Sequence, residues 1–106
     1  MNIPTKDGWM LIYPSDIYYI QSDDIYAYLY NGTEKYFVNI SLKDIEEVLD
    51  SNLFQRCHRS YIVNLNKIRR IIKNQNCVLV MENGDEVPVS RNKKETLLKN
   101  LINTKI

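Results

Sequence analysis

The chain has 106 residues and a formal net charge of +1, which predicts a single domain over residues 1–106 with one hydrophobic core. No apolar run approaches the roughly 20 residues that span a bilayer, and the first residues lack the apolar segment of a signal peptide. We therefore expect a cytoplasmic protein with no membrane partner, in which Cys57 and Cys77 are reduced thiols.

Charge is distributed unevenly along the chain. Residues 1–50 contain nine acids and three bases, a balance of −6, whereas residues 51–106 contain four acids and eleven bases, a balance of +7. No acid occurs between Ser51 and Met81. A basic stretch of this kind attracts nucleic acid. The alternative is that the two halves face and neutralise each other in the fold.

The first half of the sequence reads mainly as strands, because its tyrosines and β-branched residues suit a pleated surface. The expected strands cover residues 9–13, 17–21, 25–30 and 34–38. Pro14 ends the first strand, and residues 22–24 form a cluster typical of a turn. Asn31-Gly32 predicts a β-hairpin.

The hydrophobic period changes at Ser41 and predicts a helix over residues 42–50. Ser41 and Asp44 resemble a capping box, and Ile40 can pack on Ile45 as a hydrophobic staple. The apolar residues of this segment share one helical face. They are Leu42, Ile45, Val48 and Leu49.

Strand composition returns in the second half, with expected strands at residues 54–57, 61–65, 68–72, 77–81 and 86–89. Asn83-Gly84 predicts a second hairpin. Ser90 can cap a closing helix with an apolar stripe of Leu97, Leu98, Leu101 and Ile102. The fold class is therefore mainly β and mostly antiparallel with two short helices. Loops this short exclude a doubly wound nucleotide-binding sheet.

Catalytic and metal chemistry find little support in the sequence. Cys57 and His58 are neighbours, and neighbouring strand residues point to opposite faces, so we expect no thiol–imidazole pair; Cys57 and Cys77 should face the core. One histidine and two distant cysteines do not make a four-ligand zinc site. We expect no catalytic residue, metal, cofactor or small-molecule substrate.

The tyrosines allow two interpretations. Exposed rings on one sheet face could stack with single-stranded bases. Tyr26, Tyr28 and Tyr30 share one face of their expected strand. Packing in the core or on the sheet surface is the interpretation that residue preference favours.

The segment of residues 54–64 sets cations against an apolar, strand-forming run. A buried strand gains nothing from Arg56, His58 and Arg59 together. Guanidinium groups offer rigid forks of donors that match phosphate and the guanine edge. This segment is therefore the first candidate for an anion-binding surface.

Four blocks of the sequence together resemble the LytTR DNA-binding domain of bacterial transcription regulators. They are Asp16 to Ile20 (D-I-Y-Y-I), Ser41-Leu42, Phe54 to Asn64 (F-Q-R-C-H-R-S-Y-I-V-N), and Asn83-Gly84 followed by Val87 to Arg91 (V-P-V-S-R). Their order and spacing extend the resemblance over nearly the whole chain.

The resemblance implies about ten short strands in small antiparallel sheets, and a domain that reads duplex DNA through loops. Members of the family contact two successive major grooves, bend the DNA and bind direct-repeat operators. The module is usually the output domain of a two-component response regulator. A receiver domain or a second copy on DNA are thus expected partners, and enzymatic activity is not expected.

Carried over residue by residue, the resemblance places DNA contacts at His58 and Arg59, at Arg91, and in the region of Asp24 and Ile25. Arg91 would lie in the first turn of the last helix, whose N-terminus favours phosphate. The residues that follow either contact the DNA backbone or form a solvated helix face; they are Asn92, Lys93 and Lys94.

Two alternatives to duplex recognition stay open. The first is an RNA- or single-strand-binding β domain that uses exposed tyrosines. The second is a β module that senses a small ligand or a protein and pairs its basic patch with its own acidic half.

Overall fold

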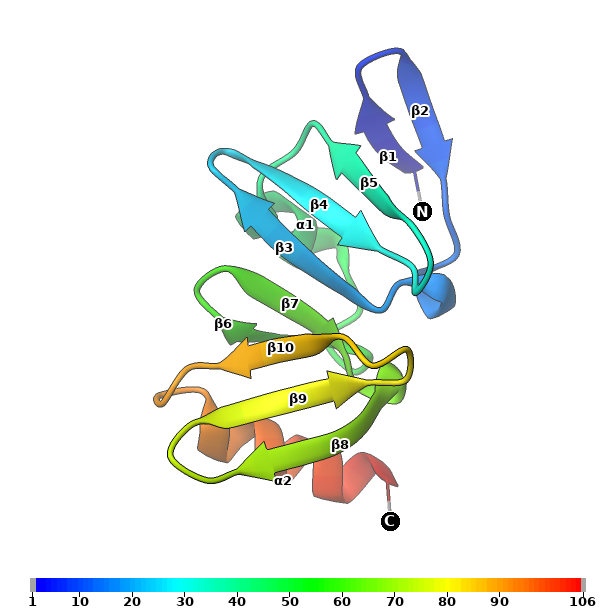
Figure 1. Ribbon diagram of the computed structural model, residues 1–106. Helices are drawn as coiled ribbons and strands as arrows, with labels where there is room; N and C mark the ends of the chain where they lie inside the picture. Colours follow the sequence, from blue (N-terminus) through cyan, green and yellow to red (C-terminus); the bar gives the residue numbers. More distant parts are fainter. Residues whose placement is uncertain (1, 106) are drawn as a thin grey trace.

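The computed structural model describes residues 2–105 and is built mainly of short strands (Figure 1). The strands are β1 (Asn2–Thr5), β2 (Gly8–Leu11), β3 (Tyr19–Asp23), β4 (Tyr26–Tyr30), β5 (Lys35–Val38), β6 (Phe54–His58), β7 (Tyr61–Asn64), β8 (Ile68–Lys73), β9 (Cys77–Met81) and β10 (Glu86–Val89). The helices are α1 (Leu42–Val48) and α2 (Lys94–Lys105), with 3-10 turns at Pro14–Asp16 and Leu65–Lys67. The expected mainly β fold is confirmed.

The strands form three antiparallel sheets. β1 and β2 make a hairpin, β5-β4-β3-β7-β6 make a five-stranded sheet, and β10-β9-β8 make a three-stranded sheet. Figure 1 shows the two larger sheets following each other along the molecule, with α1 behind the first and α2 behind the second. The molecule is elongated, with extents of 42 × 26 × 24 Å.

One core lies between α1 and the five-stranded sheet. Leu42 and Ile45 of α1 pack against Ile20 and Leu29 of the sheet, and all four are at most 4% exposed. Ile3 of β1 belongs to the same cluster. The N-terminal hairpin is therefore attached to the domain by a buried side chain.

A second core lies on the other face of the same sheet, where the three-stranded sheet and α2 pack. Tyr19, Cys57 and Val63 contribute to it from the five-stranded sheet. The opposing side chains come from β9, β10 and α2, and they include Leu79, Met81, Val87, Leu97 and Leu101. Because strand neighbours point to opposite faces, the five-stranded sheet serves both cores.

The strand expected over residues 17–21 lies two residues later, as β3. Pro14 fixes a 3-10 turn in which the Ile17 N–H donates to Pro14 O at 3.1 Å, so Ile17 is outside the sheet. At the far end, Asp24 adopts a positive φ of 59°, which lets the chain reverse after Asp23. The turn is therefore shorter than expected.

Helix α1 begins as the sequence predicts. The Ser41 hydroxyl oxygen accepts from the Asp44 N–H at 3.2 Å, which satisfies one of the unpaired donors of the first turn. The helix ends at Val48 rather than at Asp50, and the Leu49 N–H donates to Ile45 O at 3.2 Å. Val48 is 67% exposed, so the apolar face is narrower than expected.

Helix α2 begins later than the sequence predicts, and Ser90 does not cap it. The Ser90 hydroxyl donates to Asn92 Oδ1 at 2.9 Å, and the Lys93 N–H donates to Ser90 O at 3.0 Å. Residues 91–93 therefore form a separate turn, and α2 starts at Lys94. Within α2, Leu97 and Leu101 are buried whereas Ile102 is 56% exposed.

Two further differences concern hairpins. The connection after β4 contains four residues rather than the expected three, and Asn31 Oδ1 accepts from the Glu34 N–H within it at 2.9 Å. Gly32 approaches Tyr18 so closely that a Cβ would lie 2.8 Å from its ring. Strand β1 was not expected, since Pro4 disfavours a strand interior. It forms as one half of a two-stranded hairpin, and its Pro4 O accepts from the Asn39 N–H at 3.2 Å.

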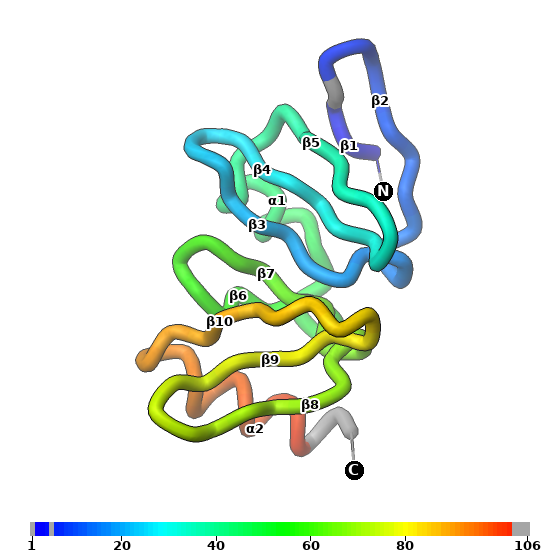
Figure 2. Tube along the Cα trace, viewed as in Figure 1, coloured from blue at the N-terminus to red at the C-terminus, as the bar shows by residue number. Residues whose placement is uncertain are grey.

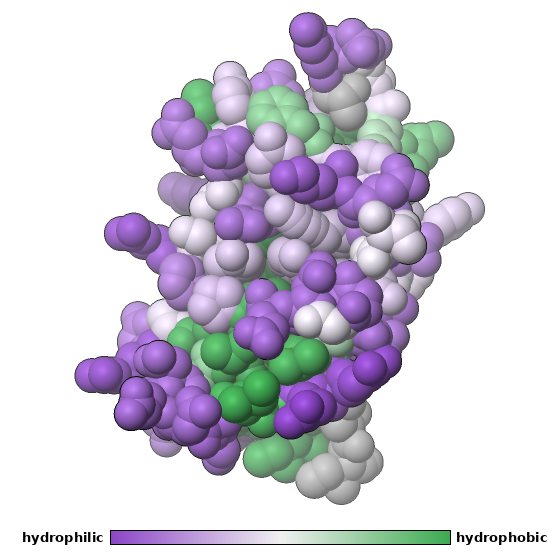
Figure 3. Space-filling view, viewed as in Figure 1, coloured by the Kyte–Doolittle hydropathy of each residue, from purple (hydrophilic) through white to green (hydrophobic). Residues whose placement is uncertain are grey.

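The surface separates polar and apolar regions. In Figure 3, hydrophobic side chains gather over the three-stranded sheet, and hydrophilic ones cover the edge beside it. By their register, Ile72, Val78 and Val80 share the outer face of this sheet, and all three are half-buried. None of the helices in residues 2–105 is long and apolar enough to cross a bilayer.

Candidate nucleic-acid interface

Three connections that contain the expected contact residues lie on the same side of the molecule. They are the β3–β4 turn with Asp24 and Ile25, the β6–β7 turn with Arg59, and the segment between β10 and α2 with Arg91. Figure 2 shows all three at the left edge of the tube, one below the other along the long axis. Residues from three distant parts of the sequence thus share one edge.

Backbone hydrogen bonds attach the outer two connections to the β6–β7 turn. The Ser22 N–H, at the end of β3, donates to Ser60 O at 2.8 Å. The Ser90 N–H, at the end of β10, donates to Cys57 O at 2.9 Å. The β6–β7 turn is therefore the central element of this edge.

The imidazole of His58 is oriented by the turn that carries it. Its Nδ1 accepts from the Ser60 N–H at 3.0 Å, and its ring lies edge-on to Tyr61 at 5.6 Å between centroids. Because Nδ1 accepts, the proton of the neutral ring is on Nε2. His58 is half-buried, and Arg59 beside it is exposed.

Arg56 differs from its two cationic neighbours, because its guanidinium bonds to protein groups. Nε donates to His58 O at 3.0 Å, and Nη2 donates to Arg59 O at 2.5 Å. Nη1 forms an ion pair with Glu46 Oε1 of α1 at 2.7 Å. The first interpretation of this segment, which grouped Arg56 with the anion-binding cations, is therefore incomplete.

A hollow of about 600 Å³ separates the β6–β7 turn from the segment before α2. Its lining includes four basic side chains and one acidic side chain. The lining residues are Glu46, Arg56, His58, Arg59, Ser90, Asn92 and Lys93. The fold thus brings His58, Arg59 and Asn92 to one concave surface, together with Lys93.

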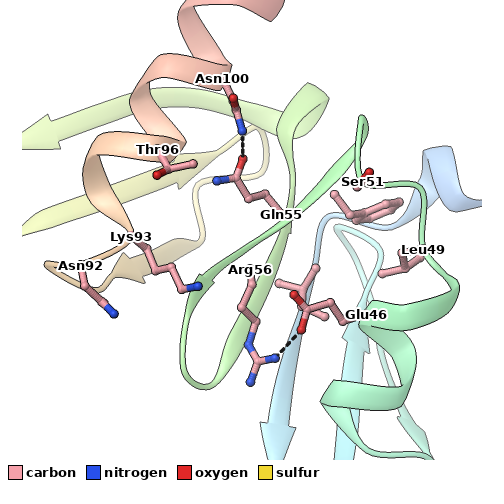
Figure 4. Close-up of a pocket in the computed structure, with 11 residues that line it drawn as sticks. Glu46, Leu49, Ser51, Gln55, Arg56, Asn92, Lys93, Thr96 and Asn100 are labelled. Atoms are coloured by element: carbon pink, nitrogen blue, oxygen red, sulfur yellow. Dashed lines mark hydrogen bonds and ion pairs between the residues drawn. The ribbon is translucent and has the colours of Figure 1, made fainter.

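A second hollow of about 370 Å³ adjoins the first and shares Glu46, Arg56, Asn92 and Lys93 with it. Figure 4 shows Lys93 extending from the turn before α2 toward the side of Arg56 and Glu46. At another place in the lining, the Asn100 side-chain amide donates to Gln55 Oε1 at 2.6 Å. This bond links α2 to β6.

The other expected contacts lie outside the helices or at their edge. Arg91 and Asn92 are exposed and lie in the turn before α2, so Arg91 is not in the first helical turn as expected. Lys94 is the first residue of α2 and is half-buried. Asp24 and Ile25 form the tip of the β3–β4 turn, where Ile25 is 62% exposed.

The tyrosines of β4 pack on the sheet surface, as residue preference indicates. Tyr26 and Tyr28 both contact Phe37 of β5 edge-on, with centroids 5.3 and 5.6 Å apart. Lys35 Nζ lies 4.7 Å from the centroid of the Tyr28 ring. These rings pack against one another, and Tyr26 and Phe37 remain 37% and 42% exposed.

The cysteines lie in the core, as expected. Cys57 and Cys77 are both buried and neither forms a disulfide. Burial raises the pKa of the Cys57 thiol to about 12, so the thiol is protonated at neutral pH. Within residues 2–105, no cluster of histidine, cysteine and acidic side chains is suited to hold a metal ion.

The chain is similar to known DNA-binding regulators over most of its length. The family model described as the LytTr DNA-binding domain matches residues 7–102. The transcriptional regulatory protein YpdB of Escherichia coli K12 is 38% identical over 92 residues, which cover 83% of this chain and 38% of YpdB. The heme-containing CO-sensing transcriptional regulator RcoM 2 of Paraburkholderia xenovorans is 38% identical over 95 residues, covering 87% of this chain and 36% of that protein.

A solved structure has the same fold. It is the LytTr DNA-binding domain of a putative methyl-accepting/DNA response regulator from Bacillus cereus, with a TM-score of 0.81 and 33% identity. The match covers 95% of this chain and 94% of that structure. In contrast, the chain spans less than two fifths of the length of YpdB and RcoM 2.

Proposed function

We propose, since this chain belongs to the LytTR family of DNA-binding domains, that it is the operator-reading output domain of a bacterial transcription regulator. We expect it to act on duplex DNA and to have no enzymatic activity. Because its relatives are much longer, we further propose that it works with a signal-receiving domain, of which a two-component receiver is one kind.

The observation that supports this proposal is the shared edge of the three connections, joined by backbone hydrogen bonds around the β6–β7 turn. The long axis of 42 Å exceeds the roughly 34 Å of one turn of B-DNA. This length belongs to the whole molecule, including the N-terminal hairpin, and we propose that the three connections, which follow one another along it, lie against one face of the duplex. Reading DNA through loops therefore fits the dimensions of the molecule.

Each expected contact residue has a chemical role that its position permits. We assign Arg59 and Arg91 to guanine edges, which guanidinium groups hold by two parallel hydrogen bonds. His58 would donate from Nε2 to a phosphate oxygen, because Nδ1 is occupied by the Ser60 N–H. The side chains assigned to the DNA backbone are Asn92, Lys93 and Lys94.

The β3–β4 turn would read bases in a different way. Asp24 is an acid, which phosphate repels, but a carboxylate accepts a hydrogen bond from the amino group of cytosine. Ile25 is exposed beside it and offers an apolar contact to the methyl group of thymine. We propose that this turn contributes base contacts and no phosphate contacts.

The proposal is tested by selecting duplexes from a random library with the chain and then competing the selected duplex against its own single strands. We expect the selected sites to contain paired direct repeats and the duplex to bind more tightly than either strand. Equal or tighter binding of single strands would favour the RNA- or single-strand-binding alternative instead.

A further inference from the structure

We propose that Arg56 and Glu46 form a positioning pair that holds the β6–β7 turn in the shape that reads DNA. In this role Arg56 does not touch DNA, and α1 supports the interface from behind through Glu46. The inference rests on the function proposed above, and it assigns to two residues a task that differs from that of the neighbouring cations.

Each of the three nitrogen atoms of the Arg56 guanidinium donates a hydrogen bond to a protein group, which uses three of its five N–H donors. Two of them hold the main-chain carbonyls of His58 and Arg59, at 3.0 and 2.5 Å. The third holds the carboxylate of Glu46 at 2.7 Å. One planar group therefore connects both contact residues of the turn to a helix.

The turn needs such support because its strand ladder is irregular. Between Arg56 and His58 the register of β6 and β7 shifts, so that His58, and not Cys57, lies opposite Tyr61. A bulge of this kind leaves ladder groups unpaired and bends the strand. The guanidinium bonds to the carbonyls just beyond the shift and fixes the direction of the turn.

Glu46 directs the guanidinium toward the turn. The Arg56 side chain is 22% exposed and the Glu46 side chain is 45% exposed, so the pair lies at the rim of the hollow shown in Figure 4. Charge-assisted hydrogen bonds are stronger and shorter than neutral ones. The bond to the carboxylate holds Nη1 of Arg56 against α1.

Positioning and simple electrostatics predict changes of opposite sign in DNA affinity when Glu46 is removed. Glu46 carries a negative charge beside the proposed DNA surface, so its removal should strengthen DNA binding if charge alone matters. If Glu46 holds Arg56 in place, its removal should weaken binding. The two explanations therefore predict opposite effects of one substitution.

The first test compares Glu46→Ala with Glu47→Ala. Both acids are exposed, adjacent residues of α1, and both substitutions remove the same charge. Binding is measured with the duplex that the wild-type chain selects from a random library. We expect Glu46→Ala to weaken binding about tenfold, as for residues that couple through contact, while Glu47→Ala leaves it unchanged or slightly tighter. Equal or tighter binding by Glu46→Ala overturns the proposal.

The second test uses Arg56→Lys, alone and in a chain that carries His58→Ala and Arg59→Ala. Lysine keeps the charge but cannot hold three directed bonds with one planar group. We expect Arg56→Lys alone to lower the affinity for DNA. Added to His58→Ala and Arg59→Ala, it should lower the affinity no further than those two substitutions already do. The measurement is made at low salt, where weak binding is detectable. Losses that simply add would show that Arg56 contacts DNA directly.

Amide hydrogen exchange, measured in the absence of DNA, tests this inference independently of the proposed function. The Ser22 N–H donates to Ser60 O, and the Ser60 N–H donates to His58 Nδ1. In Arg56→Lys both amide protons should exchange with solvent faster, while the thermal midpoint of the domain changes little. Unchanged exchange overturns the positioning role even if the chain binds duplex DNA. Faster exchange supports it even if the wild-type chain shows no duplex preference, which would refute the proposed function alone.

Discussion

Arg56 and Arg59 carry the same side chain three positions apart, yet the fold gives them different surroundings. Arg59 is exposed at the tip of the β6–β7 turn, whereas Arg56 bonds to main-chain carbonyls and to Glu46. Strand alternation cannot separate them in advance, because the register shifts between Arg56 and His58. Local patterning therefore predicted a cationic segment, and only the resemblance to a known family singled out His58 and Arg59 within it.

At the scale of single residues, we predict that Arg59→Ala and Arg91→Ala each weaken binding to the selected duplex. Loss of a bidentate guanine contact costs roughly 1 to 3 kcal/mol. Both side chains are exposed, so the free energy of unfolding should change by less than about 0.5 kcal/mol. Fluorescence anisotropy with a labelled duplex and thermal unfolding measure the two quantities.

The matched control for this prediction is Arg70→Ala. Arg70 is also exposed, but it lies within β8 and away from the three connections. The substitution Arg70→Ala removes one positive charge, as Arg59→Ala and Arg91→Ala do. If Arg70→Ala weakens binding as much as Arg59→Ala, the effect is one of overall charge, and the assignment of Arg59 and Arg91 to base contacts is wrong.

At the scale of elements, local signals located most strands and helices but not all of their ends. The cap of α1 was predictable because Ser41 and Asp44 carry it within four residues. The start of α2 was not, because the Ser90 hydroxyl donates to Asn92 instead of capping the helix. An alternative partner two residues away was enough to move the start of the helix to Lys94.

For α2, we predict that Leu97→Ala destabilises the domain strongly. Leu97 is fully buried in the core between α2 and the three-stranded sheet, and truncation of a buried leucine costs about 2 to 5 kcal/mol. The control is Ile102→Ala, since Ile102 is 56% exposed on the same helix. Urea unfolding should show a much smaller loss for Ile102→Ala, and similar losses would mean that α2 is docked in another way.

At the scale of the whole molecule, hairpin signals predicted neighbouring strands, but the pairing of β3 with β7 joins segments some forty positions apart. Tyr19 lies opposite Val63 and Gln21 opposite Tyr61 in this pairing. No turn signal in the sequence predicts such a pairing. It is also what brings the β3–β4 turn to the β6–β7 turn, through the Ser22 and Ser60 bond. The shared edge thus depends on a long-range contact that no local signal in the sequence predicts.

The uneven charge of the two halves leads to the last prediction, which concerns the salt dependence of DNA binding. Ion pairs in residues 2–105 join Arg56 to Glu46, across the halves, and Lys67 to Glu82, within the basic half. Arg59, in contrast, is exposed and lines the larger hollow, and Arg91 is exposed between its lining residues Ser90 and Asn92 in the chain. The basic half therefore presents cations to a polyanion.

Each phosphate that a cation neutralises releases counterions, which contributes about −0.9 to the slope of log K against log salt concentration. Because Lys93 and Lys94 are the two lysines assigned to phosphates, we expect these contacts to give a slope of about −2. A titration of the selected duplex between low and moderate salt measures it. A slope near zero would mean that the basic half is neutralised within the protein, as in a module that senses a ligand or a protein. A steep slope that is equal for unrelated duplexes would instead leave the phosphate contacts standing and remove the assignment of Arg59 and Arg91 to bases.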